Sequence, residues 1–179
     1  MNFFEIFAEC SIALTGFGAI HAALRGSEHP RGVFRAWTVV LVGAIAFLLC
    51  VLPLLLALTD LTAENVWRVA STIGLPITTI AAASTFRFDF RLTKIGYPPQ
   101  APGFLRTAQI AMIIPAVVLL STMVGWPSAP GPFLYAIAPA SLLFAGLLVM
   151  VHSFLVPMQH VFVQEQPKSE EIDLDAGVE

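Results

Sequence analysis

Two carboxylates stand inside an apolar stretch near the start of the chain. Glu5 and Glu9 belong to "FFEIFAECSIALTGFGAIHAAL", residues 3–24, which is nearly long enough and apolar enough to cross a bilayer. A carboxylate in hydrocarbon is costly, so such residues typically pair with a cation or bind and release protons. Arg68 is the basic residue expected at a similar depth. We therefore expect Glu9, with Arg68 and Glu5 near it, to form either a buried ion pair or an ion or proton site.

Two histidines could perform a different chemistry. His21 and His152 are expected at comparable depth near the same membrane surface, on the first and last apolar segments. Imidazole nitrogens on adjacent helices can ligate haem iron or a metal ion. Each side chain could equally reach interfacial water, because it stands within about a turn of the boundary. We expect no cofactor and keep haem or metal ligation by this pair as the minor alternative.

The composition indicates that these residues stand in a membrane protein. Of the 179 residues, 57% are apolar and 12% are charged, whereas soluble domains are about 45–50% apolar and about 25% charged. So few charges cannot cover a soluble surface. The sequence also shows no glycine-rich phosphate loop, zinc-ligand spacing, nucleophile–base spacing or basic patch. This pattern argues against an enzyme and against nucleic-acid binding.

Five stretches are long enough to cross the hydrocarbon as helices, which takes about 20 apolar residues each. They cover approximately residues 3–24, 34–58, 65–86, 105–125 and 133–156. The expected fold is therefore an all-α membrane bundle, with residues 1–157 as one domain. Residues 158–179 are rich in charge and poor in aromatic residues, so we expect them to be an acidic, largely disordered cytoplasmic tail.

The basic residues are distributed unevenly over the connections. Eight of the nine fall in the first and third connections, at their borders or in the tail: Arg25, Arg31, Arg35, Arg87, Arg91, Lys94, Arg106 and Lys168. Arg68 alone falls on the other side. Cytoplasmic loops carry the excess of Lys and Arg. We therefore expect the N-terminus outside and the C-terminus in the cytoplasm.

The first segment has unlike faces when it is drawn as a helix. Small and hydroxyl-bearing residues gather on one side and predict a helix contact: Ser11, Thr15, Gly16 and Gly18. The carboxylates border this side, so we expect them to point into protein, either within the bundle or at a subunit contact. Bulky residues such as Leu14 and Phe17 lie opposite and suit lipid. We expect a homo-oligomer with this segment at or near the contact.

Four of the segments carry an interior proline: Pro53, Pro76, Pro115 and Pro139. Each removes one backbone hydrogen bond and crowds the preceding turn. Such residues mark either a hinge or unwound ion site, or ordinary kinked packing, which is common in membrane helices.

The third connection, residues 86–106, begins with a different pattern. "FRFDFRL" alternates apolar and charged residues with period two, which predicts a short strand or an extended interfacial segment. In that conformation Arg87, Asp89 and Arg91 face water. "GYPPQAPG" then predicts a turn-rich stretch. We expect this loop to anchor at the membrane surface, or to dock anionic lipid or a membrane protein partner.

The opening of the chain, "EIFAECSIALTGFGAI" at residues 5–20, resembles that of a set of uncharacterised small bacterial inner-membrane proteins of about this length. The resemblance implies a bacterial inner-membrane location and carries no activity with it. Three functions stay open. The first is an oligomeric ion or proton channel or transporter that uses Glu9. The second is a non-catalytic structural or accessory subunit of a larger membrane complex. The third is the haem or metal protein.

Overall fold

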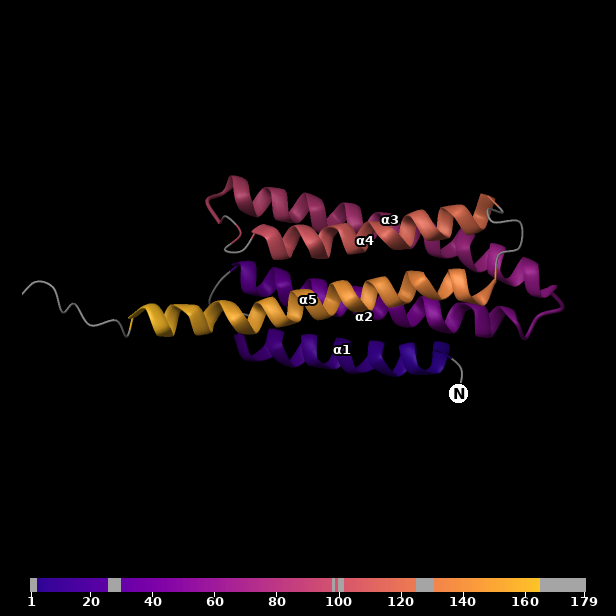
Figure 1. Cartoon of the computed structure of the whole chain (residues 1–179), viewed down its shortest axis with the longest axis horizontal. Coiled ribbons are helices and arrows are strands. Elements are labelled where there is room, and N and C mark those ends of the chain that lie inside the picture. Colours follow the sequence, from indigo (N-terminus) through magenta and orange to yellow (C-terminus); the bar gives the residue numbers. More distant parts are fainter. Residues whose placement is uncertain (1–2, 26–29, 98, 100–101, 125–130, 165–179) are drawn as a thin grey trace, which may run out of the picture.

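The computed structural model describes residues 3–25, 30–97, 99, 102–124 and 131–164. They form five α-helices (Figure 1): α1 (Phe3–Arg25), α2 (Pro30–Leu56), α3 (Ala63–Lys94), α4 (Pro102–Val124) and α5 (Pro132–Gln164). All five are long enough and apolar enough to cross a membrane. The expected all-helical fold is thus confirmed, and the five apolar helices indicate a multi-pass membrane protein.

Consecutive helices run in opposite directions, so α1 begins at one end of the bundle and α5 finishes at the other (Figure 1). α2 lies at the centre and packs against α1, α3 and α5, while α4 packs against α3 and α5. α1 lies at the edge, along α2 and α5. We call the end that holds the start of α2 and the end of α3 the Arg31 end, and the opposite one the Glu9 end.

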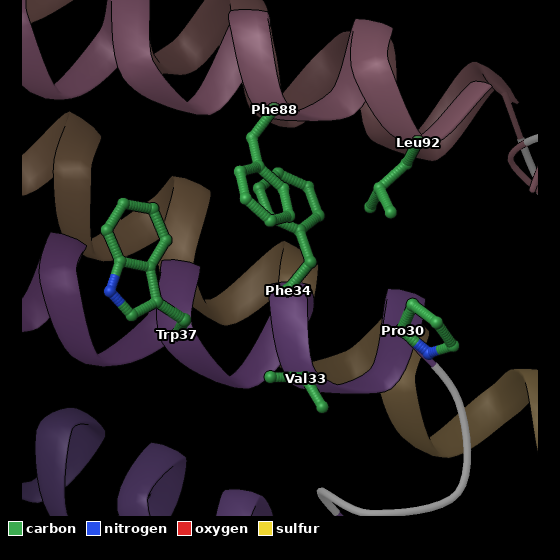
Figure 2. Close-up of a pocket in the computed structure, with 6 residues that line it drawn as sticks. All are labelled: Pro30, Val33, Phe34, Trp37, Phe88 and Leu92. Carbon is green, nitrogen blue, oxygen red and sulfur yellow. The ribbon is translucent and has the colours of Figure 1, made fainter. Parts of the chain in front are cut away.

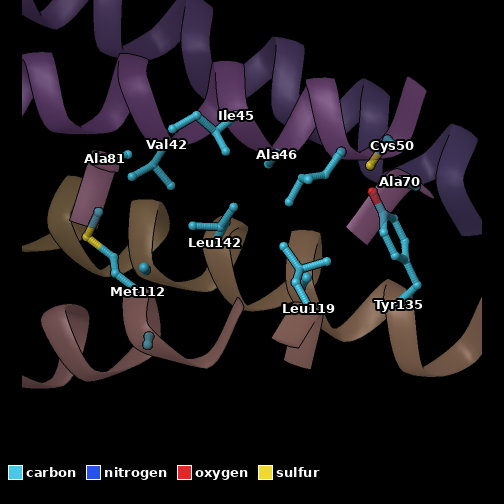
Figure 3. Close-up of a cluster of buried hydrophobic side chains, with 14 of the residues drawn as sticks. Val42, Ile45, Ala46, Cys50, Ala70, Ala81, Met112, Leu119, Tyr135 and Leu142 are labelled. Carbon is cyan, nitrogen blue, oxygen red and sulfur yellow. The ribbon is translucent and has the colours of Figure 1, made fainter. Parts of the chain in front are cut away.

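The core between the helices combines branched residues with alanines (Figure 3). Ala46, Ala70 and Ala138 are fully buried beside Leu49 and Leu119. Lipid tails are as apolar as these side chains, so burial from water does not drive helix association inside a bilayer. Close van der Waals contact does, and small residues permit it.

Helices α1 and α2 approach each other closely where Gly43 meets Thr15. A Cβ atom added to Gly43 would lie 2.3 Å from the Thr15 Oγ1 atom and 3.1 Å from the Ser11 carbonyl oxygen. Glycine is therefore required where α1 crosses α2. Leu14 packs in the same way over Gly146 of α5 and is buried. The expected position of Leu14 facing lipid was wrong. α1 packs into the groove between α2 and α5, so the side of α1 that faces protein is wider than contact with α2 alone would require.

Aromatic rings tie α1 to the other helices at the Glu9 end. The Phe4 ring stacks on the Trp67 ring with centroids 5.6 Å apart. The Tyr135 ring lies 5.4 Å from the Trp67 ring. These contacts join α1, α3 and α5, and they fix the first turn of α1 against the bundle.

The helices continue through the four prolines that the sequence analysis singled out. Pro53, Pro115 and Pro139 are buried, whereas Pro76 is exposed. Nearby hydroxyls bond to carbonyls of their own helices: Thr72 to Arg68, Ser121 to Val118 and Ser141 to Ala138. None of these three acceptors is a carbonyl that a proline frees, because proline frees the carbonyl four residues before it.

The expected strand or extended segment after residue 86 was wrong. α3 continues to Lys94, and α4 begins at Pro102, so the connection is much shorter than residues 86–106. The period-two alternation was misleading because Leu92 follows Phe88 by four residues and Asp89 by three, which is about one helical turn. That spacing lets a helix turn all three toward α2.

α5 is also longer than expected and runs to Gln164. Residues 158–164, which we assigned to the acidic tail, continue this helix. The rest of the expected tail lies outside the described residues.

Candidate functional site: a buried polar cluster between α2, α3 and α4

The C-terminus of α3 forms a tight cap that brings the chain back toward α2. The Tyr97 N–H donates to the Leu92 carbonyl (3.0 Å), and the Gly96 N–H donates to the Thr93 carbonyl (3.3 Å). This pair of bonds is the Schellman arrangement, which needs a left-handed residue just past the helix. Gly96 supplies it with a φ of +91°. The turn leaves the Tyr97 carbonyl pointing at Arg31 of α2.

Arg31 is the centre of the cluster and is 4% exposed. Its Nη1 atom lies 2.8 Å from the Asp89 Oδ1 atom in a salt bridge. Its Nη2 atom donates to the Thr93 hydroxyl (2.9 Å), and its Nε atom donates to the Tyr97 carbonyl. The guanidinium is therefore bound by two side chains of the last turns of α3 and by a carbonyl just past its cap.

The remaining Asp89 oxygen is used by the next helix. The Gln109 side-chain amide of α4 donates to the Asp89 Oδ2 atom (3.2 Å). The Thr93 hydroxyl also donates to the Asp89 carbonyl (2.9 Å). Both carboxylate oxygens are thus engaged, and one residue joins α2 to α4. We call Arg31, Asp89, Thr93, Tyr97 and Gln109 the Arg31 cluster.

The cluster suits a structural role better than a chemical one. A buried charge is tolerated when it is paired and its remaining hydrogen-bonding groups are satisfied. A cavity of about 20 Å³ adjoins it, lined in part by Arg35, Thr38 and Gln109. Such a volume is enough for a single water molecule. The geometry therefore fixes three helices against one another.

An apolar pocket of about 390 Å³ opens beside the cluster (Figure 2). Pro30, Val33, Phe34 and Trp37 of α2 and Phe88 and Leu92 of α3 line it. The Phe34 and Phe88 rings stack with centroids 5.2 Å apart and form its floor between the helices. Trp37 is 46% exposed at its side.

The structure separates the two residues that the sequence suggested as an ion pair. Arg68 pairs with Glu64, one turn earlier on α3, with 2.7 Å between the Nη2 and Oε1 atoms. Both of these side chains are about half exposed. Glu9 is exposed on α1, and the described residues give it no ion pair or hydrogen bond. Glu5 is exposed on the same side of α1.

The four small residues expected at a helix contact divide between two sides of α1. Ser11 and Gly18 are buried and Thr15 is half-buried, all toward α2. The two hydroxyls donate within α1, to the Phe7 and Ser11 carbonyls. Gly16 is exposed, with no described atom within 4 Å of a Cβ added there. It lies on the outer side, where Glu9 also is.

The two candidate haem or metal ligands have different surroundings at the Arg31 end. The His21 ring lies against the Phe154 ring of α5, with centroids 5.4 Å apart. His152 is 6% exposed. Within the described part of the chain, no group of three or more His, Cys, Asp or Glu side chains is placed to hold a metal ion.

Sequence reasoning missed the Arg31 cluster. Arg31 was assigned only to the positive-inside pattern, and Asp89 was expected to face water. A usable signal existed: Asp89 and Thr93 are one helical turn apart, beside Leu92, so a helical continuation would place a carboxylate and a hydroxyl together. The partner Arg31 could not be identified, because it lies 58 residues away in the chain.

The chain matches no protein-family model, and no curated protein and no solved structure is significantly similar to it.

Proposed function

We propose that this chain is a non-catalytic membrane protein that assembles with copies of itself through the outer face of α1. Glu9 carries the proposal. It is exposed within the apolar segment Phe3–His21, where the described residues provide no partner. A carboxylate facing lipid is unfavourable, by about 3 kcal/mol at a helix centre and less toward its ends. A protein surface covering α1 removes that cost.

The outer face of α1 has the composition of a helix contact. We define it as Glu5, Glu9, Ile12, Gly16 and Ala23, all of which are exposed. Ile12 is 59% exposed, and Gly16 offers an open backbone beside it. Small residues let a second helix approach closely, and a carboxylate can then form hydrogen bonds across the contact.

The assembly is expected to depend on Gly16. Gly16→Leu places a large side chain on the outer face and should convert the oligomer to monomer, while the bundle stays folded. Native mass spectrometry in mild detergent measures the oligomer, and circular dichroism measures the fold. Gly103→Leu is the matched control, because Gly103 on α4 is equally open. A wild-type protein that is purely monomeric would contradict the proposal, as would equal loss of oligomer in both variants.

Ion or proton passage is the second candidate, and the same residue favours it. A carboxylate enclosed between subunits at membrane depth can bind a proton or a cation. The pathway would then run between copies, since Glu9 is not among the residues that line the four pockets described for residues 3–25, 30–97, 99, 102–124 and 131–164. Proton flux into proteoliposomes should fall in Glu9→Gln and stay unchanged in Glu64→Gln. Absence of flux in the wild type would remove this candidate and leave the assembly role.

The proposal includes the membrane that holds the chain and the orientation of the chain in it. The resemblance of residues 5–20 supports the bacterial inner membrane. The uneven basic residues support an N-terminus outside and a C-terminus in the cytoplasm. In this arrangement the Arg31 end is cytoplasmic, and Glu9 lies in the outer half of the bilayer.

A further inference from the structure

We propose that the apolar pocket between α2 and α3 binds an acyl chain of an anionic phospholipid, with the headgroup held at the Arg31 end. The pocket, of about 390 Å³, has the size and the apolar lining of a small-molecule site. It opens at the side of two helices that are apolar enough to cross a membrane. In a bilayer the molecules that meet such an opening are lipids.

The depth of the pocket places a lipid at the membrane surface. Its lining begins at Pro30, the first residue of α2, and extends two turns to Trp37. Trp37 stands two turns inside α2, and tryptophan is typical of the zone where the headgroups meet the hydrocarbon. An acyl chain in the pocket therefore has its headgroup beside the first turn of α2. The N–H groups of that turn are free of helical partners and carry the positive end of the helix dipole.

The charge at this end selects an anionic headgroup. Asp89 is already neutralised by Arg31. Arg91 follows Phe88 by three residues and directly precedes Leu92, which are both lining residues of α3, and it is exposed. Arg87 and Lys94 are also exposed on the last turns of α3. The described residues give none of these three cations an ion pair. A phosphate beside Arg91 would supply the missing charge.

Quenching of Trp37 fluorescence by brominated lipids tests the proposal on the full-length protein. Vesicles of phosphatidylcholine would contain either phosphatidylglycerol or further phosphatidylcholine brominated on the acyl chain. Trp37→Phe identifies the share of the quenching that belongs to Trp37. We expect that share to saturate with brominated phosphatidylglycerol at lower mole fraction than with brominated phosphatidylcholine. Equal quenching by both lipids would overturn the choice of an anionic headgroup.

Three substitutions separate a site from diffuse charge attraction. Arg91→Gln should reduce the preference for phosphatidylglycerol about fivefold, the equivalent of about 1 kcal/mol for one basic residue at the surface. Arg106→Gln removes the same charge from α4, away from the pocket lining, and should leave the preference unchanged. Val33→Phe fills the pocket from a position that is 45% exposed, so the fold is kept and saturable quenching is lost. Equal effects of Arg91→Gln and Arg106→Gln, or saturable quenching that survives Val33→Phe, would overturn the proposal.

Discussion

Replacing Arg31 by glutamine is expected to lower the free energy of unfolding by about 3–5 kcal/mol, because it leaves the Asp89 carboxylate buried without its counter-charge. The side chains of Arg31 and Asp89 are 5% and 16% exposed, and their charged atoms are 2.8 Å apart. Equilibrium unfolding in mild detergent, followed by circular dichroism, measures the loss. The substitution should also loosen the contact between α2 and α3 at the Arg31 end.

The exposed ion pair on α3 is the control. Arg68 and Glu64 are about half exposed and one turn apart, and pairs of that kind contribute about 0.3–0.5 kcal/mol. Arg68→Gln should therefore change stability far less than Arg31→Gln. Replacing both partners, as Arg31→Met with Asp89→Leu, should recover part of the loss, since no buried charge then remains. Arg31→Gln and Arg68→Gln with equal stability would show that the Arg31 cluster does not hold the helices.

Gly43→Ala is expected to destabilise the bundle by about 1–3 kcal/mol, the usual cost of overpacking. The added Cβ atom would lie 2.3 Å from the Thr15 Oγ1 atom and within 3.2 Å of the α1 backbone. A backbone cannot yield as a flexible side chain can, so α1 must move away from α2. The same unfolding measurement detects the loss, and Gly43→Leu should give a larger one.

A double substitution distinguishes this steric cause from a general effect of the alanine. Thr15→Ala removes the hydroxyl that the new Cβ atom meets, and should restore part of the stability of Gly43→Ala. Gly103→Ala is the control, because nothing lies within 4 Å of its added Cβ atom. A Gly43→Ala protein as stable as Gly103→Ala would contradict the close contact of α1 with α2.

The number and approximate positions of the helices could be predicted because they depend on long apolar runs, which a single sequence displays directly. The extent of α3 could not. The pattern around Phe88 and Asp89 fits period two locally, and its helical conformation depends on Arg31 and Phe34, which are distant in the chain. Side-chain partners of this kind are set by packing, so sequence spacing alone does not identify them.

Only some residues of α1 could be assigned to the correct face from the sequence, because packing also decides which side of the helix faces inward. Ser11 and Gly18 could be assigned to a contact because small residues mark close approach. Gly16 was grouped with them, yet the helix places it outward, and Leu14 was grouped with lipid-facing residues, yet it packs over Gly146. Which edge of the small-residue side faces inward depends on where α5 lies. That position is a property of the whole bundle.

The assembly of copies through the outer face of α1 is tested most directly by thiol cross-linking in native membranes. Ile12→Cys and Phe17→Cys, each combined with Cys10→Ser, present single exposed thiols on α1, since Cys50 is buried. Ile12 and Phe17 are equally exposed, at 59% and 57%, but Ile12 lies on the outer face beside Glu9 and Phe17 lies well to one side of it. With a short bismaleimide we expect Ile12→Cys to give a covalent dimer and Phe17→Cys to stay monomeric. Equal cross-linking of the two variants, or none in either, would contradict the proposed contact.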